Sequence, residues 1–457
     1  MFKGKIINNT CILICILLIT GTCLSQNRQD TIQSTVRDSI ASPQIAYRYI
    51  RGIDQDEEAG FRPLWTLKKG IVFIPEQFAK GVKFASGYGV DLIDDPKFLN
   101  DLESFFFNSD RSIGWYPIVD ITSQLRPRAG FNLVYHHTPF QAIIKGKYAD
   151  EEKFKIESRF SFFKMDQEQV FRANLNVLYE YDDDRKFYGF GADPQNDPRN
   201  HFYQELVDDH GIYFQEHKNV QMTLGYKPHQ HMSYYYSSSW DQRYIRDADE
   251  GTKTRLYEVM DVDQVPGMNS TYNQWYYELS WRFNSHNENR YLSRGFFSQF
   301  CLGIDKGMGS HPNLNLKTGL DMFTRIPVIQ ENRVLTPRLV VQTIKNLDNE
   351  HAIPFAEYPD HYTFRGVNTR TMLRVDNVIM VPSLQYSWPL SFNLGGHVFM
   401  DYLLSGKNLK KTGMYHAPWA AGFILDFHSL NEELANAKVI YGSEGWRFHI
   451  DIGVSLY

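Results

Sequence analysis

WRFHIDIGVSLY, residues 446–457, is the stretch that decides the fold. Every second residue from Phe448 to Leu456 is apolar, whereas the intervening residues from Arg447 to Ser455 are polar, charged or glycine. Successive side chains of a β-strand point to opposite faces of the sheet, so this segment has one apolar face and one polar face. The pattern therefore predicts a strand with an apolar environment on one side and water on the other.

The same two-faced pattern recurs through most of the chain, in segments long enough to cross a bilayer as tilted strands. Apolar side chains alternate with more polar ones over 171–179 and again over 275–283. A membrane-spanning strand needs about 9–11 residues, and a closed barrel satisfies its backbone hydrogen bonds between strands. Lipid outside and a wet lumen inside suit such faces. We therefore expect a transmembrane β-barrel.

Sixteen segments carry the strand pattern, and single-chain bacterial barrels usually have an even number of strands. They lie near 114–122, 129–138, 140–149, 152–164, 168–181, 202–216, 218–227, 231–246, 272–284, 289–305, 312–325, 333–345, 375–388, 391–403, 417–428 and 445–457. The predicted fold class is all-β, a 16-stranded antiparallel transmembrane β-barrel, with fourteen or eighteen strands as alternatives. Short joins are expected at 136–139 and 390–391. The longest excursions are expected at 182–200, 247–271 and 346–374.

Composition agrees with this class of membrane protein. Aromatic residues make up 15% of the chain although its mean hydropathy is negative. That pairing is natural when the lumen and loops are polar and the lipid face carries aromatic girdles. Outside the N-terminus no run of about eighteen apolar residues occurs, which argues against a membrane-spanning helix. The formal net charge of -5 gives no broad basic surface, so nucleic acid is not an expected partner.

The N-terminus has the pattern of a secretory signal peptide. Two lysines precede an apolar core at 11–19 and a short polar stretch, so we expect cleavage after Ser25. Lipidation at Cys23 is the competing interpretation, although the threonines around it fit a lipoprotein box poorly. The mature chain would keep only Cys301 of the 4 cysteines and could form no intramolecular disulfide.

Three segments are expected along the chain. Residues 1–25 form the signal peptide, residues 26–110 a short, partly disordered periplasmic N-terminal segment, and residues 111–457 the barrel. The periplasmic segment starts polar and has helix-start patterns at 75–82 and 95–102. The expected location is the outer membrane of a Gram-negative type of cell.

Two short motifs lie in the C-terminal part of the chain. FRG at 364–366 stands within the excursion at 346–374, and FMD at 399–401 follows it. By parity along its strand, Asp401 points into the lumen. A guanidinium in a partly dehydrated lumen needs a carboxylate partner, so we expect Arg365 to pair with Asp401.

These motifs resemble those of the BamA/TamA outer-membrane assembly superfamily. In that family the sixth extracellular loop folds back into a sixteen-stranded barrel, and its arginine-glycine-aromatic tip contacts the aspartate of a Phe-x-Asp element on the wall. FYGFG at 187–191 is similar to a Phe-Tyr-Gly-x-Gly stretch that is frequent in these barrels. The resemblance implies a loop latch at Phe364, Arg365, Gly366, Phe399 and Asp401, and a family motif at Phe187, Tyr188, Gly189 and Gly191.

The chain departs from the family pattern at several points. Val367 stands where an aromatic residue is usual, and Leu403 stands where a glycine often follows the wall aspartate. Residues 26–110 lack the strand-helix-helix-strand-strand pattern of a POTRA domain, the periplasmic module that receives substrates. The resemblance therefore implies a member without POTRA domains. It would assist insertion or translocation of proteins or lipids, in contact with outer-membrane lipid and with a separate periplasmic chaperone or assembly-machine subunit.

The alternative function is a passive channel or a structural subunit of an outer-membrane complex. We expect no enzyme, because no Gly-x-Ser-x-Gly elbow occurs and the adjacent Ser310 and His311 would face opposite ways on a strand. The histidines at 136–137 and 229–231 have no acidic or cysteine ligand at a useful spacing. No metal site and no cofactor are therefore expected.

Overall fold

The computed structural model describes most of the chain beyond residue 105. The described residues are 106–108, 112–122, 128–150, 153–166, 169–203, 210–248, 254–286, 294–309, 311–328, 330–348, 350–359, 363–366, 371–372, 375–389, 394–409, 417–428, 433–443 and 445–452. The expected signal peptide with its alternative at Cys23 lies outside them, as does the expected periplasmic segment apart from residues 106–108. Ser310 and Val367 also lie outside the described residues.

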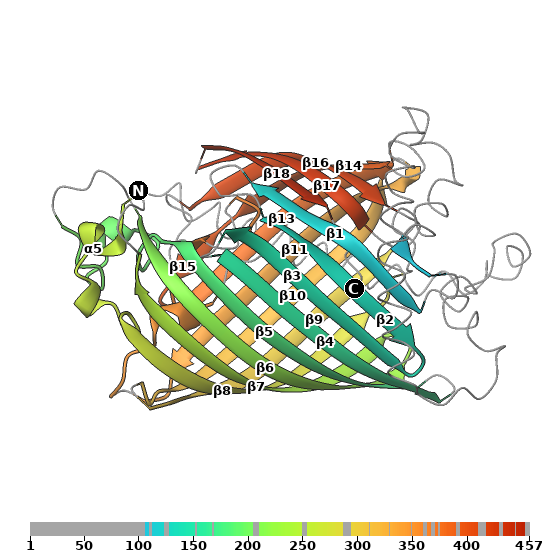
Figure 1. Cartoon of the computed structure of the whole chain (residues 1–457). Coiled ribbons are helices and arrows are strands. Elements are labelled where there is room, and N and C mark those ends of the chain that lie inside the picture. The colour runs from blue at the N-terminus through green and yellow to red at the C-terminus, as the bar shows by residue number, and fades with distance from the viewer. Residues whose placement is uncertain are drawn as a thin grey trace, which may run out of the picture. The chain divides into compact units, whose positions relative to one another are not determined.

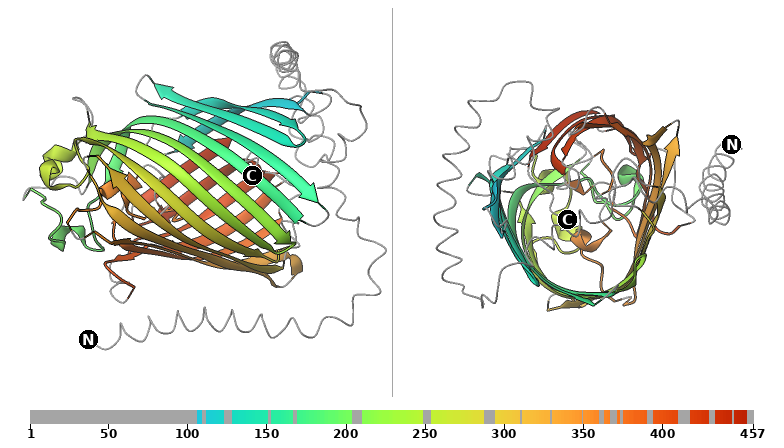
Figure 2. Two further views of the ribbon diagram at one scale, coloured as in Figure 1. Left: turned by 90° about the horizontal axis from the view of Figure 1, so that it is seen from below. Right: turned by 90° about the vertical axis from the view of Figure 1, so that its right-hand side faces the viewer.

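The described chain forms a closed barrel of 16 antiparallel strands, which confirms the predicted fold class (Figures 1 and 2). The strands are β1 (Ile113–Thr122), β2 (Arg128–His137), β3 (Phe140–Asp150), β4 (Lys153–Asp166), β5 (Gln169–Phe187), β6 (Gly211–His229), β7 (Met232–Asp247), β8 (Ser270–Asn284), β9 (Gly295–Met308), β10 (Leu314–Val328), β11 (Gln330–Asn346), β12 (Thr371–Met372), β13 (Val378–Pro389), β14 (Leu394–Tyr402), β15 (Leu404–Gly406), β16 (Trp419–His428), β17 (Glu433–Gly442) and β18 (Gly445–Ile452). β14 and β15 both pair with β13 and together make one wall strand. β12 instead pairs in parallel with the end of β5.

Short helical turns occur only in the connections of the described chain. They are η3 (Pro194–Asn196), α5 (Leu256–Val259), η4 (Val262–Gln264) and η5 (Phe355–Glu357). Among the described residues, no helix is both long enough and apolar enough to cross a membrane.

The alternation in the sequence corresponds to the two surfaces of the barrel wall. On β18, Trp446 and Phe448 are 69% and 43% exposed on the outer surface, whereas Arg447 between them is buried. Large apolar side chains cover the outer surface of many strands, including Phe131, Ile144, Phe160, Leu175, Met222, Leu279, Leu302 and Val398. Buried polar side chains occur on the opposite surface, among them Asn132, Gln215, Gln274, Asp305, Asp401 and Asp426. A step of one residue along a strand therefore moves from a surface suited to lipid to the polar lumen.

The number of strands is confirmed, but one strand was predicted as two, another was missed, and β5 continues to Phe187, six residues past its predicted end. The strands predicted at 202–216 and 218–227 are one continuous strand, β6, that begins at Gly211. The polar run in its middle resembled a turn, but there the backbone is paired with both β5 and β7, and His217 hydrogen-bonds Asp241. β17 was missed because its outward positions include Ala435 and Ala437, which give a weak apolar signal.

Three tight joins lie at one end of the barrel, and the three longest connections lie at the other. The joins between β2 and β3, between β4 and β5, and between β6 and β7 each contain two residues. At the other end the chain crosses between strands eight times, and the connection from β11 to β13 is the sixth of these. This sixth loop contains the FRG motif. Its place in the order of loops is the one that the family resemblance implies.

Loops from three connections pack together at the long-loop end (Figure 1). Their buried side chains include Phe187, Phe190, Tyr213, Leu256, Met260, Tyr272, Phe355 and Val375. We call this group the loop cap. Because its members come from β5, α5, η5 and the strand ends around them, the loops form an apolar cluster rather than separate solvated excursions.

β1 and β18 close the barrel over a short described register. Only four residue pairs, from Val119 with Ile452 to Thr122 with His449, join them among the described residues. β1 makes eight such pairs with β2, and β17 makes eight with β18. We call the contact between β1 and β18 the seam. It has fewer described pairs than the wall contacts on either side of it.

Candidate functional site

The tip of the sixth loop packs against the inner wall of the barrel. Phe364 is 2% exposed and belongs to a buried cluster with Phe399 on β14 and Ala420 on β16. Tyr188, Val381 and Leu403 belong to the same cluster. We call this the latch cluster. Burial of apolar side chains here holds the tip against the wall, because each fully buried large side chain contributes roughly 1.5–3 kcal/mol.

Arg365 makes a dense set of contacts with Asp401. Its Nε and Nη2 donate hydrogen bonds to the two carboxylate oxygens at 2.8 and 2.6 Å, and its backbone N–H donates to Oδ2 at 3.1 Å. Asp401 is fully buried, whereas the Arg365 side chain is 22% exposed. The guanidinium carbon lies 3.7 Å from the centroid of the Phe399 ring. A two-pronged, charge-assisted pair with a cation–π contact fixes both the position and the orientation of the tip.

The wall strands place these partners by register. Gln385 on β13 lies opposite Phe399, and Ser383 lies opposite Asp401. Since alternate residues of a strand share a face, Gln385 is on the lumen side with Asp401, and its Oε1 accepts a hydrogen bond from Arg365 Nη1 at 2.6 Å. The arginine therefore contacts two adjacent strands at once.

Gly366 lets the tip approach the wall closely. A Cβ at this position would lie 2.4 Å from the Phe364 ring and 2.9 Å from the Ala420 side chain. Leu403, in place of the glycine frequent in the family, is buried in the latch cluster. The departure at this position thus adds apolar contact to the same cluster.

The FYGFG stretch lies beside the returning limb of the sixth loop. Val375 N–H donates to the Gly189 carbonyl at 3.2 Å, and Gly191 N–H donates to the Val375 carbonyl at 2.8 Å. Gly189 and Gly191 have φ of +89° and +87°, a backbone region that strongly favours glycine. Phe187 packs in the loop cap whereas Tyr188 packs in the latch cluster. The motif therefore joins the two clusters through adjacent side chains.

A polar clamp, made of Asp197, Arg199, Asn200 and Asp376, secures the same limb. Arg199 Nη1 donates to Asp376 Oδ1 at 3.1 Å, and its Nε donates to Asp197 Oδ1 at 2.9 Å. Asn200 exchanges two hydrogen bonds with the Phe190 backbone, both at 2.8 Å. Sequence reasoning missed this clamp, because Arg199 and Asp376 are 177 positions apart and neither belongs to a motif.

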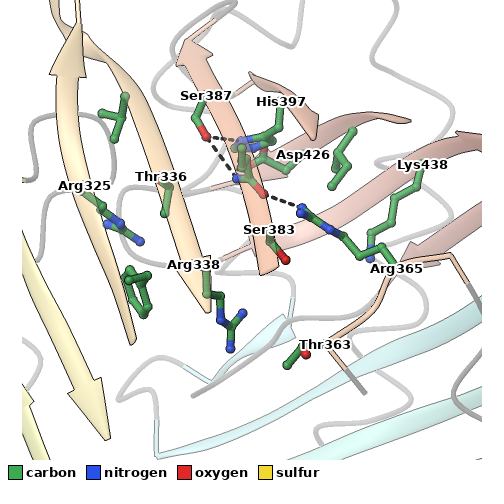
Figure 3. A pocket seen from close by; sticks show the side chains of 14 residues that line it. Arg325, Thr336, Arg338, Thr363, Arg365, Ser383, Ser387, His397, Asp426 and Lys438 are labelled. Atoms are coloured by element: carbon green, nitrogen blue, oxygen red, sulfur yellow. Dashed lines mark hydrogen bonds and ion pairs between the residues drawn. The ribbon is translucent and has the colours of Figure 1, made fainter. Parts of the chain in front are cut away.

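A cavity of about 530 Å³ lies beside the latch in the lumen (Figure 3). Arg325, Arg338, Arg365, Lys438, Ser383, Gln385, Ser387, His397 and Asp426 are among its lining residues. Arg338 pairs with Asp321 through two hydrogen bonds at 2.9 and 2.7 Å. A second cavity of about 420 Å³ is lined by both basic and acidic side chains, including Arg128, Lys147, Lys155, Arg185, Arg243, Glu157 and Glu180. The lumen is therefore polar and contains ion pairs.

Removing the tip from the wall would carry an electrostatic cost at Asp401. With the tip in place, the buried Asp401 accepts three hydrogen bonds from Arg365. If the tip left the wall, that carboxylate would have to be rehydrated, protonated or paired again, because an unpaired buried charge is strongly unfavourable. Movement of the sixth-loop tip away from the wall therefore requires the Asp401 carboxylate to be rehydrated, protonated or paired again.

Comparison with known proteins gives matches among solved structures. No protein-family model and no curated protein matches the chain. BamA from Haemophilus ducreyi lacking POTRA domains 1–3 is 12% identical with a TM-score of 0.49, and the match covers 75% of this chain and 70% of that one. CdiB from Acinetobacter baumannii is 10% identical with a TM-score of 0.44, and the match covers 75% of this chain and 60% of that one. BauA, the ferric preacinetobactin receptor from Acinetobacter baumannii, is 9% identical with a TM-score of 0.32, covering 72% and 54%.

Proposed function

We propose that this chain is an outer-membrane barrel of the BamA/TamA type, without POTRA domains, that assists insertion or translocation of proteins or lipids. In this proposal a separate periplasmic protein delivers the substrate. The observation that carries it is the contact of Arg365, at the tip of the sixth loop, with Asp401 on the lumen wall of a barrel of 16 strands. An arginine tip paired with a wall aspartate is the feature that the sequence resemblance ties to this family.

The two surfaces of the wall support a location in the outer membrane. The outer surface carries exposed aromatic and aliphatic side chains on strands around the barrel, whereas buried charges lie inside. Exposed apolar patches far larger than those of soluble monomers mark a membrane contact. In this proposal lipid covers the wall, and residues 1–25 supply the export signal.

The seam gives this proposal a mechanism. In the lipid core each unsatisfied backbone group costs several kcal/mol, so the wall separates most readily where the fewest residue pairs have to part. The seam has four described residue pairs, whereas β5 and β6 share 16. We propose that β1 and β18 separate sideways to give a substrate access to the bilayer while the rest of the wall stays paired.

A simple open pore is disfavoured by the contents of the barrel. The latch places the sixth-loop tip against the lumen wall, and the loop cap gathers three connections at one end. Conductance in planar bilayers distinguishes the two functions, because a latched loop gives low, fluctuating current whereas a simple pore conducts steadily. Steady, high conductance would favour the channel.

Affinity purification from gently solubilised outer membranes, followed by mass spectrometry, tests whether the barrel has an assembly role. Reproducible recovery of a periplasmic chaperone, an assembly machine or a client would support the proposal. Recovery of the barrel alone from repeated preparations would contradict it. The Arg365→Ala variant in the same experiment would show whether partner binding depends on the latched loop.

A thiol cross-link across the seam tests the lateral opening. In a Cys301→Ser background, Val119→Cys with Ile452→Cys places two thiols on directly opposed residues of β1 and β18. The matched control is Val439→Cys with Phe448→Cys, opposed on β17 and β18. Oxidation should block assembly of the recovered client in the seam variant and spare it in the control. Equal activity of the oxidised and reduced seam variants would refute lateral opening.

A further inference from the structure

Ser387, His397 and Asp426 form a hydrogen-bonded row across three neighbouring wall strands. Ser387 on β13 lies directly opposite His397 on β14, and Ser387 Oγ is 2.7 Å from His397 Nδ1. His397 Nε2 is 2.6 Å from Asp426 Oδ1 on β16. Figure 3 shows Ser387 and His397 pointing toward each other beside the cavity, with Asp426 behind the histidine. All three side chains line that cavity of about 530 Å³.

The carboxylate fixes which ring nitrogen is the base. Asp426 is 4% exposed, and a carboxylate can only accept, so the neutral imidazole places its N–H on Nε2. Nδ1 is then the acceptor, and the Ser387 hydroxyl donates to it. A hydroxyl bonded to a basic ring nitrogen, with a buried carboxylate on the other nitrogen, is the arrangement that activates a serine nucleophile. The arrangement is recognised by geometry and not by sequence order.

Gln385 adds a hydrogen-bond donor next to the hydroxyl. Its Nε2 lies 3.1 Å from Ser387 Oγ and 3.2 Å from His397 Nδ1. The Arg365 guanidinium donates to Gln385 Oε1 at 2.6 Å, which fixes the amide with its NH₂ group toward the serine. Side-chain amides aimed at a developing oxyanion are a common source of transition-state stabilisation. Lys438 lines the same cavity and favours negative charge there.

We propose that Ser387, His397 and Asp426 form an acyl-transfer site that hydrolyses a small carboxylic ester bound in the lumen. Ser387 Oγ bonds to the ester carbonyl carbon as its proton passes to His397 Nδ1, and the carbonyl oxygen becomes an oxyanion beside Gln385. The carbon–oxygen bond to the alcohol then breaks, and the alkoxide takes the proton from His397. His397 then takes a proton from water, and the resulting hydroxide attacks the carbonyl carbon of the acyl-serine. The bond between that carbon and Ser387 Oγ breaks, which releases the carboxylic acid, and His397 returns the proton to Ser387.

The cavity suits this chemistry in size and polarity. A volume of about 530 Å³ lies within the range of small-molecule sites, which are about 300–1,000 Å³. Asp426 is buried whereas Ser387 and His397 are only partly buried, so an ester and water can reach the nucleophile while the orienting carboxylate has little exposure to solvent. Because Arg365 holds Gln385, the loop latch also maintains the oxyanion donor.

The test uses the full-length folded barrel in detergent micelles and a fluorophosphonate probe, which labels activated serines covalently. Peptide mass spectrometry locates the label, and circular dichroism verifies the fold of each variant. We expect labelling at Ser387, its loss in Ser387→Ala, and labelling about 100-fold or more slower in His397→Gln, because general-base catalysis contributes about 10²–10⁴-fold. Ser280→Ala is the matched control, since Ser280 is a buried serine on the wall strand β8 that does not line this cavity, and this variant should label Ser387 at the unaltered rate.

Two results would overturn the proposal. The first is that Ser387 in the unaltered barrel is labelled no faster than Ser383. This comparison uses only the unaltered protein, so it does not depend on the folding of a variant. The other is an unchanged rate in a folded His397→Gln barrel, which would reduce the row to a structural hydrogen-bond network. Hydrolysis of 4-nitrophenyl acetate that tracks Ser387 labelling across the variants would show turnover, whereas hydrolysis that persists in Ser387→Ala would place any activity elsewhere.

Discussion

Replacing Arg365 with alanine should leave Asp401 as an uncompensated buried carboxylate. The substitution removes two charge-assisted hydrogen bonds at 2.8 and 2.6 Å, and only the backbone N–H of residue 365 remains as a donor from the loop. Breaking a buried ion pair costs about 3–5 kcal/mol. Because the Arg365 side chain is 22% exposed, we take the lower end and expect Arg365→Ala to reduce the free energy of unfolding by about 3 kcal/mol.

The second half of the prediction concerns non-additivity. Asp401→Ala should cost a similar amount, because it leaves the guanidinium with Gln385 as its remaining side-chain acceptor among the described residues. The double variant removes both charges, so its loss should fall short of the sum of the single losses by about 2–3 kcal/mol. Groups in direct contact couple by about 0.5–3 kcal/mol.

The lumen offers a matched control with similar geometry and more solvent. Arg338 and Asp321 also share two hydrogen bonds, but their side chains are 36% and 21% exposed. Partly solvated ion pairs are worth about 0.2–1 kcal/mol. The same double-mutant cycle at this pair should therefore give a coupling below about 1 kcal/mol.

Guanidinium-induced unfolding of the purified barrel in detergent, followed by tryptophan fluorescence, measures both cycles. Equal slopes of unfolding free energy against denaturant concentration would show that the variants unfold the same structure. The reasoning fails if the losses at Arg365 and Asp401 are additive within about 0.5 kcal/mol. It also fails if the Arg338 and Asp321 cycle couples as strongly, because burial would then not be the source of the energy.

Three further predictions concern the loops and the latch cluster. Gly191→Ala should expose the loops to limited proteolysis more than Gly309→Ala does, because both have positive φ but only the Gly191 Cβ would meet another side chain, the Asp197 carboxylate at 2.4 Å. Phe399→Ala should lower the free energy of unfolding by about 3–5 kcal/mol, measured by the same denaturation, since the buried ring packs in the latch cluster. Burial raises the pKa of Asp197, but hydrogen bonds from Arg199 outweigh burial and hold it below the ordinary value. Its stabilisation is therefore present above the unfolded pKa and is lost as pH falls through the lower folded pKa, so protease resistance of these loops should be the same at pH 7 and pH 5 and should drop only below about pH 3.9.

Local pattern was sufficient to predict the class of fold and most strands. Alternation is a property of neighbouring residues, so Trp446 and Phe448 could be placed on the outer surface without knowing what lies beside them. Local pattern failed where pairing decides the structure. The polar middle of β6 is a strand because β5 and β7 flank it, and β17 is a strand although its outer face is rich in alanine.

The residues of the site fall into two groups. Some stand in short sequence motifs, and others are brought together only by the pairing of strands. Arg365 and Asp401 stand in short motifs, so a resemblance could join them before their geometry was known. Ser387, His397 and Asp426 have no shared motif, and their spacings of 10 and 29 residues acquire meaning only through strand register. A search for a serine elbow could not find a nucleophile that sits on a regular wall strand and takes its base from the next one.

Register also explains why a buried ion pair stands on the wall of this barrel. A shift of one residue in the pairing of two strands moves every side chain of the shifted strand to the other face. Because many strands of this barrel share the same alternation, many pairings are nearly equivalent. On β14, Asp401 faces the lumen whereas Met400 and Val398 face outward. A slip of one residue in this strand would turn Asp401 toward the apolar surface and deprive it of Arg365. The latch therefore penalises the wrong register by the cost of an unpaired carboxylate, so the contact that holds the loop also specifies the pairing of the strands that receive it.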